Sequence, residues 1–170
     1  PVPRADRPAD AIGALTPGPA GPADVARQAR DEDDPAVLDQ LLALPEVHLV
    51  IDGYNVTKAG YGSLTLAEQR FRLLGGLAGL AAQSGAEITC VFDGADLRGP
   101  VPLAAPRGVR VLFSRTGETA DELICRLVHA EPTGRPVVVV SSDREVAEGV
   151  RRTGARPVPA AMLLRRLGRG

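Results

Sequence analysis

The chain has very few aromatic residues and no tryptophan. Its 170 residues include three Phe and two Tyr. A hydrophobic core must therefore be built mainly from Leu, Val, Ile and Ala. Hydrophobic residues make up 44% of the chain, which is normal for a globular domain. The length suits one domain with a real core and hardly two.

Cysteines and long apolar runs are also scarce. Two cysteines, Cys90 and Cys125, are too few for a disulfide framework or a four-cysteine zinc site, and we expect both to be buried free thiols. No apolar run approaches the roughly 18 residues that span a bilayer. The first residues lack the apolar segment of a secretion signal. We therefore expect a cytoplasmic protein with no membrane partner. Because the chain begins with Pro, we also expect a fragment or a processed form.

The net charge of −1 hides an uneven distribution. Residues 1–46 carry 4 Arg against 9 Asp and Glu, whereas residues 47–170 carry 16 Lys and Arg against 12 Asp and Glu. These counts give −5 for the leader and +4 for the remainder. A mildly basic domain weakly favours a polyanionic partner. Residues 1–34 are rich in Pro, Ala and Gly, so we predict a linker or tail there.

A short helix is predicted over residues 35–46. Acidic residues at 31–34 followed by Pro35 favour a helix start. Leucines recur at helical spacing between residues 38 and 44, giving one apolar face. That face could pack on the domain that follows, or on a neighbouring domain or partner that the sequence does not contain.

From residue 47 onward the pattern alternates between strand and helix. Predicted strands cover 47–51, 87–92, 109–113, 137–140 and 155–158, and predicted helices cover 65–82, the stretch from 119, 143–152 and 160–167. Capping boxes at Thr65, Thr119 and Ser142 mark three helix starts. This alternation predicts an α/β domain over residues 47–170: a three-layer α/β/α sandwich with a mainly parallel sheet of about five strands.

Aspartates stand where such a sheet places its ligands, at the carboxyl ends of the strands. Asp52 and Asp93 follow the first and second predicted strands, and Asp143 follows the strand at 137–140. Asp121 lies in the first turn of the helix that Thr119 caps. We therefore predict that four carboxylates from distant segments converge on one rim.

Four carboxylates on one rim would repel one another, and one of a close pair would normally take up a proton. A divalent cation removes that conflict, because Mg²⁺ and Mn²⁺ prefer carboxylate and water oxygens. The ion can also lower the pKa of a water that attacks a phosphodiester. Asn55, three residues after Asp52, could hydrogen-bond a carboxylate, a water or substrate.

Each aspartate has a structural interpretation when taken alone. Asp143 lies in a capping box, and Asp121 lies in a first turn where the helix dipole favours negative charge. The pairs Asp52-Gly53 and Asp93-Gly94 are common in turns. The metal-site prediction therefore depends on their shared placement at strand ends rather than on any single residue.

These motifs together resemble the NYN domain, in the YacP-like branch of the PIN-like nuclease superfamily. The similar segments are Asp52-Gly-Tyr-Asn55, Phe92-Asp93-Gly94, Thr119-Ala-Asp-Glu122 and Ser141-Ser-Asp143, within residues 47–168. The resemblance implies a PIN-like parallel sheet and metal-dependent RNase activity, and the family includes ribosome-linked mRNA endonucleases. It implies Asp52, Asp93, Asp121 and Asp143 as the catalytic and metal-binding carboxylates, beside Asn55. Glu118 and Glu122 rank lower as additional carboxylates.

Substrate contacts are expected from polar residues near the strand ends. The candidates are Asn55, Lys58, Arg98, Arg115 and Ser142. Arginine and lysine could contact RNA phosphates, or they could be solvated surface charges. His48, inside the first strand, and His129, at a helix end, are interpreted as structural.

The leading hypothesis is a Mg²⁺- or Mn²⁺-dependent endoribonuclease, a hydrolase that acts on single-stranded or ribosome-bound RNA. The alternative is an RNA-binding module with little or no catalysis; a homodimer stays open in either case. A haloacid-dehalogenase-like phosphatase would need a second aspartate where Tyr54 stands. A nucleotide-binding Rossmann domain would need G-x-G-x-x-G after the first strand, and the sequence has none there.

Overall fold

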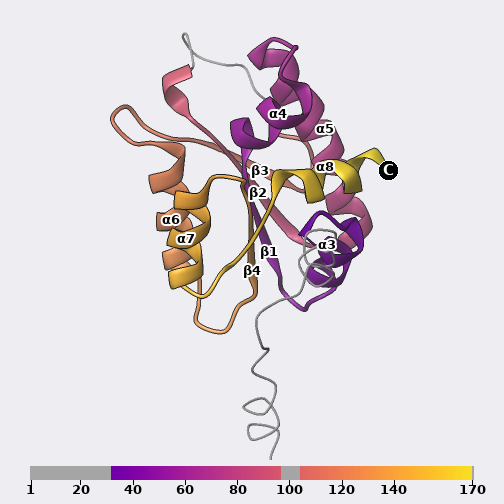
Figure 1. Cartoon of the computed structure of the whole chain (residues 1–170), viewed down its shortest axis with the longest axis vertical. Helices are drawn as coiled ribbons and strands as arrows, with labels where there is room; N and C mark the ends of the chain where they lie inside the picture. The colour runs from indigo at the N-terminus through magenta and orange to yellow at the C-terminus, as the bar shows by residue number, and fades with distance from the viewer. Residues whose placement is uncertain (1–31, 97–103, 170) are drawn as a thin grey trace, which may run out of the picture. The chain divides into compact units, whose positions relative to one another are not determined.

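A five-stranded parallel sheet forms the middle layer of the domain (Figure 1). The computed structural model describes residues 32–96 and 104–169, so residues 1–31 of the predicted tail, and Arg98, lie outside the described residues. The strand order is β3-β2-β1-β4-β5, and every neighbouring pair is parallel. The strands are β1 (His48–Asp52), β2 (Glu87–Phe92), β3 (Val109–Phe113), β4 (Val137–Val140) and β5 (Arg156–Val158).

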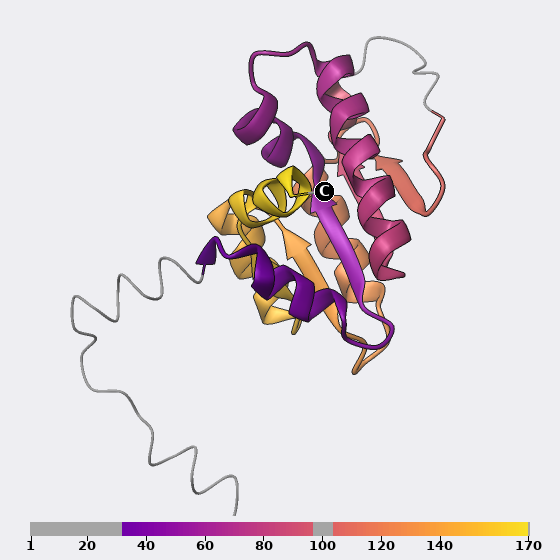
Figure 2. The ribbon, with the colours of Figure 1, turned by 90° about the vertical axis from the view of Figure 1, so that its right-hand side faces the viewer.

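Helices cover both faces of the sheet, which confirms the predicted three layers (Figures 1 and 2). The helices are α3 (Pro35–Leu42), α4 (Gly53–Tyr61), α5 (Leu66–Ser84), α6 (Ala120–Ala130), α7 (Arg144–Arg152) and α8 (Ala160–Gly168), with a 3₁₀ turn η2 (Gly94–Asp96). The side chains of α3, α4, α5 and α8 share one core cluster, and those of α6 and α7 share the other.

Alternation along the strands divides the core between the two faces. Leu49 and Ile51 of β1 point into the cluster under α5, whereas Val50 points into the cluster under α6. In β4, Val138 and Val139 divide in the same way. Both strands are fully buried, as expected of continuous apolar runs covered by helices on both sides.

Side-chain caps begin four of the described helices, including α3, where Asp34 accepts the amide of Ala36. The capping boxes at Thr65 and Thr119 are confirmed. The third predicted capping box, at Ser142, is wrong. Asp143 caps α7 instead, accepting from two amides in its first turn, because the Ser142 hydroxyl accepts the amide of Ala160 at the start of α8. The serine therefore stabilises a helix distant in sequence.

The helix α4 was not among the helices predicted from the sequence. It begins directly after Asp52 and has no side-chain hydrogen bond at its cap. Gly53 and Gly60 lower its intrinsic helix propensity. Packing stabilises it, because Tyr54 and Val56 are buried in the core.

The short helix α3 packs on the domain rather than on a missing neighbour. Its residues Leu38 and Leu42 are buried in the same core cluster as β1. The Arg166 guanidinium of α8 donates a hydrogen bond of 2.7 Å from Nε to Oδ1 of Asp39. The helix lies beside α8 in both views (Figures 1 and 2). Through this packing, the apolar face of α3 becomes part of the core cluster that also contains side chains of α4, α5 and α8.

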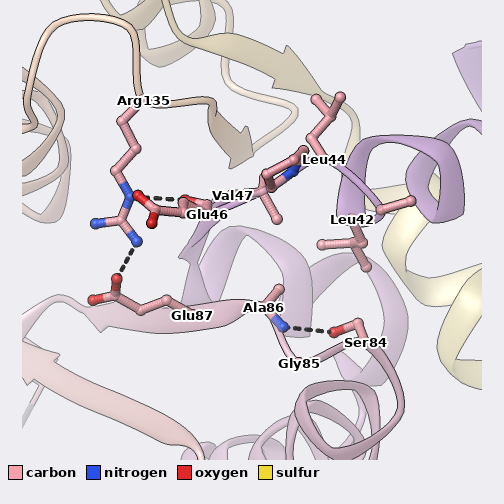
Figure 3. A pocket seen from close by; sticks show the side chains of 11 residues that line it. Leu42, Leu44, Glu46, Val47, Ser84, Gly85, Ala86, Glu87 and Arg135 are labelled. Carbon is pink, nitrogen blue, oxygen red and sulfur yellow. Dashed lines mark hydrogen bonds and ion pairs between the residues drawn. The ribbon is translucent and has the colours of Figure 1, made fainter.

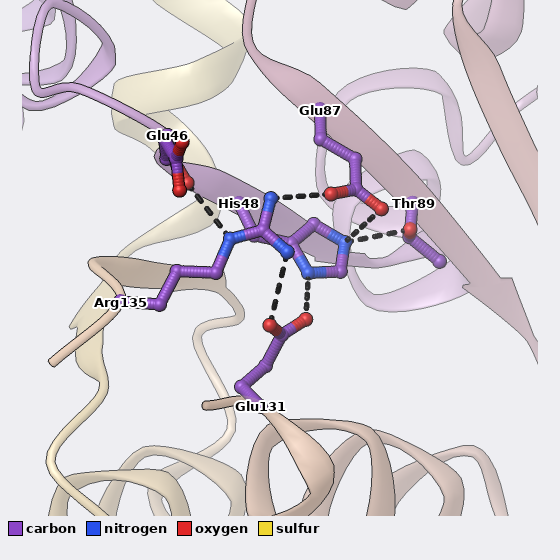
Figure 4. A network of polar contacts seen from close by, with 6 residues as sticks. All are labelled: Glu46, His48, Glu87, Thr89, Glu131 and Arg135. Atoms are coloured by element: carbon purple, nitrogen blue, oxygen red, sulfur yellow. Dashed lines mark hydrogen bonds and ion pairs between the residues drawn. The ribbon is translucent and has the colours of Figure 1, made fainter. Parts of the chain in front are cut away.

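A polar network joins the strands at their amino-terminal ends (Figure 4). Arg135 donates to the backbone oxygen of Glu46 at 2.8 Å and to Oε2 of Glu131 at 3.0 Å, and also binds Glu87. The ring of His48 contacts Glu131 through Nδ1 and Thr89 through Nε2. His48 is therefore structural, as predicted.

The amino-terminal end of the sheet also carries a pocket of about 570 Å³, between the ends of α3 and α5 (Figure 3). Glu46, Glu87 and Arg135 line it. Arg135 is already engaged by both neighbouring segments, so the pocket offers no free cationic group from the described residues. Of the two cysteines, Cys90 is buried as predicted, whereas the prediction is wrong for Cys125, which is only half-buried in α6.

Candidate active site: a carboxylate rim at the switch point

The connections of the sheet reverse direction between β1 and β4. The helix α4 follows β1 and packs in the core cluster on one face, whereas α7 follows β4 and packs on the other. Neighbouring strands whose connections diverge in this way leave a crevice at their carboxyl ends, where open parallel sheets bind ligands. Asp52 is the last residue of β1, and Asp143 lies three residues after β4.

Asp52 is held firmly at the centre of this crevice. Its side chain is 5% exposed, and its Oδ2 accepts a hydrogen bond of 2.8 Å from the hydroxyl of Ser141. The same hydroxyl accepts the backbone amide of Asp143 at 3.1 Å. One serine oxygen therefore links the carboxylate of β1 to the turn that begins α7.

The electrostatics show that the four predicted aspartates influence one another. Burial raises the pKa of Asp52 to about 6, the Ser141 hydrogen bond opposes this shift, and the charges of Asp121, Asp143 and Asp93 add to it. Burial also raises the pKa of Asp121, and Asp143 and Asp93 contribute again. The negative charges of Asp93, Asp121 and Asp143 thus act on the pKa of Asp52, and those of Asp93 and Asp143 act on the pKa of Asp121.

Two of these aspartates also stabilise local structure. Oδ1 of Asp93 accepts the amide of Ala95 at 2.9 Å, and Oδ1 of Asp143 accepts the amide of Glu145 at 2.8 Å. In both, Oδ2 accepts no hydrogen bond from the residues that the structure describes. The structural and the chemical interpretations are therefore compatible, because each uses a different oxygen.

The donor chemistry of the rim suits a hard divalent cation. Carboxylate oxygens are the ligands that Mg²⁺ and Mn²⁺ prefer, and mutual repulsion opposes the ionised state in their absence. Within residues 32–96 and 104–169, no three acidic, histidine or cysteine side chains are already close enough to hold one ion. Binding would therefore involve side-chain movement or bridging waters, which Mg²⁺ commonly retains.

Of the predicted substrate-binding residues, the structure describes four: Asn55 and Lys58 lie in α4, Arg115 follows β3, and Ser142 follows β4. Oδ1 of Asn55 accepts the amide of Ser142 at 2.8 Å, which fixes α4 against the segment after β4. Lys58 and Arg115 are exposed, and the ammonium of Lys58 lies 5.7 Å from the ring centroid of Tyr54. The lower-ranked acids have other partners: Glu118 binds Arg126 at 3.0 Å, and Glu122 completes the capping box of α6.

Two residues that were given no role from the sequence support the site. Ser141, quoted only as part of the segment Ser141-Ser-Asp143, bridges Asp52 and α7. Arg70 of α5 donates a hydrogen bond of 2.7 Å to the hydroxyl of Tyr54, two residues after Asp52. No sequence spacing links Arg70 to α4, so only the fold reveals that contact.

The sheet order and the aspartate rim together define an α/β domain of the PIN-like nuclease class. The chain belongs to the YacP-like NYN domain family, whose profile matches residues 49–169. This family implies nuclease activity, which is a hydrolase activity, in general terms. The resemblance inferred from the sequence is thereby confirmed.

Two solved structures are similar to the chain, both of Rae1 (YacP) from Bacillus subtilis. One aligns with a TM-score of 0.64 and 28% identity, over 71% of this chain and 73% of that one. A single-substitution mutant aligns with a TM-score of 0.62 and 26% identity, over 72% and 74%. No protein with a curated functional description matches this chain.

Proposed function

We propose that the chain is a Mg²⁺- or Mn²⁺-dependent endoribonuclease that cleaves RNA phosphodiester bonds at the carboxylate rim. The observation that supports this proposal is the buried Asp52 at the point where the sheet connections reverse, with burial and the charges of Asp121, Asp143 and Asp93 raising its pKa. The membership of a nuclease family supports the reaction class.

In this proposal Asp52, Asp93, Asp121 and Asp143 hold the metal. A bound divalent ion would supply Lewis-acid stabilisation and lower the pKa of a water near the scissile phosphate. The hydroxyl of Ser141 fixes the orientation of Asp52 by donating to its Oδ2.

Residues around the rim would position the substrate. The Asn55 amide group keeps the segment after β4 in place through the backbone of Ser142. Lys58 and Arg115 are exposed cations that could neutralise RNA phosphates near the rim. Arg98, outside the described residues, keeps the same proposed role. Ser142 keeps its proposed substrate role through its hydroxyl, which accepts the amide of Ala160 and donates to none of the described residues.

RNA as the substrate class is supported by family resemblance and by the charge of the domain. Residues 47–170 carry 16 Lys and Arg against 12 Asp and Glu. That excess of four positive charges suits a polyanion. None of the described helices is long and apolar enough to cross a membrane. Single-stranded or ribosome-bound RNA, a cytoplasmic location and a homodimer remain predictions.

The second candidate is an RNA-binding module with little or no catalysis. One observation favours it: among the described residues no three metal-binding side chains are yet close enough to share an ion. A module of this kind would bind RNA with a strong salt dependence but would cleave none.

A cleavage assay separates the two functions. Metal-free protein is mixed with end-labelled single-stranded RNA, and Mg²⁺ or Mn²⁺ is then added. The nuclease proposal expects internal cleavage only with metal, and a loss of at least about 100-fold in rate for Asp52→Asn. Binding without cleavage under every metal condition would favour the module. Equal cleavage by wild type and Asp52→Asn would contradict the assigned site.

A further inference from the structure

The largest exposed apolar side chain of the described residues lies on α5, close to α4. Phe71 is 84% exposed, although the chain has only five aromatic residues. Leu64, Ala67 and Arg72 adjoin it in a shallow apolar depression of about 480 Å³. An exposed phenylalanine in such a depression indicates an interaction surface rather than a packing role.

Two exposed basic side chains, Lys58 of α4 and Arg72 of α5, each lie beside a tyrosine ring of α4 on this α4–α5 surface. Tyr54 is buried in the core, whereas Tyr61 is half-buried. The Lys58 ammonium lies 5.7 Å from the centroid of Tyr54, and the Arg72 guanidinium lies 4.9 Å from the centroid of Tyr61. Each ring therefore has a cation beside it.

Arg70 supplies a second and independent observation. Its side chain is 8% exposed, and its only hydrogen bond to a described residue goes to the Tyr54 hydroxyl. Its Nε is buried without a partner, and no described carboxylate lies within ion-pair distance of it. A buried cation without an anion is costly, so an anionic ligand at this position would stabilise the protein.

The charge of the two helices matches that requirement. Between residues 53 and 76 the charged side chains are Lys58, Glu68, Arg70 and Arg72, a net charge of +2. Glu68 is already used in the capping box of α5. The helix α4, which carries Lys58, begins directly after Asp52.

We propose that the α4–α5 surface binds single-stranded RNA, with Phe71 stacking on an unpaired base and Lys58, Arg70 and Arg72 neutralising the adjacent phosphates. Stacking on an aromatic ring beside basic side chains is the general chemistry of single-strand recognition. This inference rests on the proposed RNA nuclease function and assigns the path that the strand follows away from Asp52. An unpaired base is required, because a ring on a helix cannot stack on bases inside a duplex.

The absence of tryptophan offers a direct test. Phe71→Trp places a single fluorescent indole on the proposed surface, and Leu44→Trp, at a residue that is 42% exposed near the opposite end of the sheet, is the matched control. Both are titrated with a short single-stranded RNA in EDTA, so that no cleavage occurs. Saturable quenching of the indole at position 71 only is the expected result.

Binding constants complete the test. Fluorescence anisotropy of labelled RNA should show that Phe71→Ala raises the Kd by about 5- to 100-fold. Arg72→Gln should reduce the slope of log K against log salt by about 1. Circular dichroism should show unchanged unfolding for both surface variants.

The outcomes separate this inference from the proposed function. Quenching at position 71 without any metal-dependent cleavage would leave the inference standing and overturn the nuclease proposal. RNA cleavage and binding that are unchanged in Phe71→Ala would overturn the inference alone, and no RNA binding by the wild type would overturn both. A wild-type dimer that Phe71→Ala converts to a monomer would assign the surface to self-association instead, which also overturns the inference.

Discussion

The hydroxyl of Ser141 donates a hydrogen bond of 2.8 Å to Oδ2 of Asp52, joining the two strands between which the sheet connections reverse. Both side chains are buried, so water cannot replace this bond. The same oxygen accepts the amide of Asp143. The position of the central carboxylate is therefore coupled to the start of α7, and the pair is the natural first target for mutation.

Ser141→Ala should shift the pH profile of cleavage. The Ser141 hydrogen bond holds the pKa of Asp52 below the value that burial alone would impose. Without this hydrogen bond the carboxyl group of Asp52 takes up its proton at a higher pH. The acid limb of the pH profile of cleavage should therefore shift to higher pH. The unpaired buried oxygen should also cost about 1–3 kcal/mol of stability.

Ser142→Ala is the matched control for that variant. Its hydroxyl stabilises the start of α8 rather than Asp52. The expected effect is a loss of about 1 kcal/mol in the free energy of unfolding. An acid limb that moves equally in both serine variants would contradict the role assigned to Ser141.

Asp52→Asn should stabilise the metal-free protein at neutral pH. The pKa of Asp52 rises from 3.8 to about 6 in the folded state. Between these values the folded protein binds the proton more tightly than the unfolded chain, so the wild type loses stability as pH increases. Asparagine has no such titration.

The gain from Asp52→Asn should reach about 1–3 kcal/mol at pH 7.5 and vanish below about pH 4, where the carboxyl is neutral in both states. Urea unfolding in EDTA at both pH values measures it. Added Mn²⁺ should raise the melting temperature of the wild type more than that of the variant. A variant that is less stable at pH 7.5 would show that the carboxylate is structurally favourable.

Two substitutions of Asp143 separate its cap from its proposed metal role. Asparagine caps helices about as well as aspartate, whereas alanine does not. Asp143→Asn should therefore lose cleavage while α7 stays intact. Asp143→Ala should lose cleavage and about 1 kcal/mol of stability as well. Wild-type cleavage by Asp143→Asn, measured with saturating Mg²⁺, would restrict the residue to capping.

The network at the opposite end of the sheet should affect stability alone. Arg135→Met removes the side chain that links Glu46, Glu87 and Glu131, and should cost about 2 kcal/mol. Arg126→Met, at an exposed ion pair with Glu118, should cost less than about 0.5 kcal/mol. Cleavage rates at 20 °C should match the wild type in both. A large loss of rate in Arg135→Met would show coupling between the two ends.

The strands were the most predictable part of the fold. The runs 87–92 and 137–140 were predicted with the observed bounds, because a strand buried on both faces leaves a continuous apolar signal. The edge strand at 109–113 was also predicted with its observed bounds, although only Val109 is buried there. The helix α4 left no such signal. Its glycines and missing cap weaken the local pattern, and its stability comes from burying Tyr54 and Val56 against segments distant in sequence.

The part of the candidate site that follows directly from the strands was also predictable from the sequence. Aspartates directly after strands reach the carboxyl edge of any parallel sheet, so the neighbourhood of Asp52 and Asp143 followed from spacing. The bond from Ser141 to Asp52 and the bond from Arg70 to Tyr54 did not follow from spacing. Both depend on which residue faces which across the fold, and no sequence period encodes that.

The most direct measurement is an anomalous-scattering map of crystals soaked in Mn²⁺. The account predicts a peak at the rim, in contact with Asp52 and with at least one of Asp93, Asp121 and Asp143, and no such peak in crystals of Asp52→Asn. Saturating Mn²⁺ that leaves the rim without a peak, or that gives a peak touching none of these carboxylates, would contradict it.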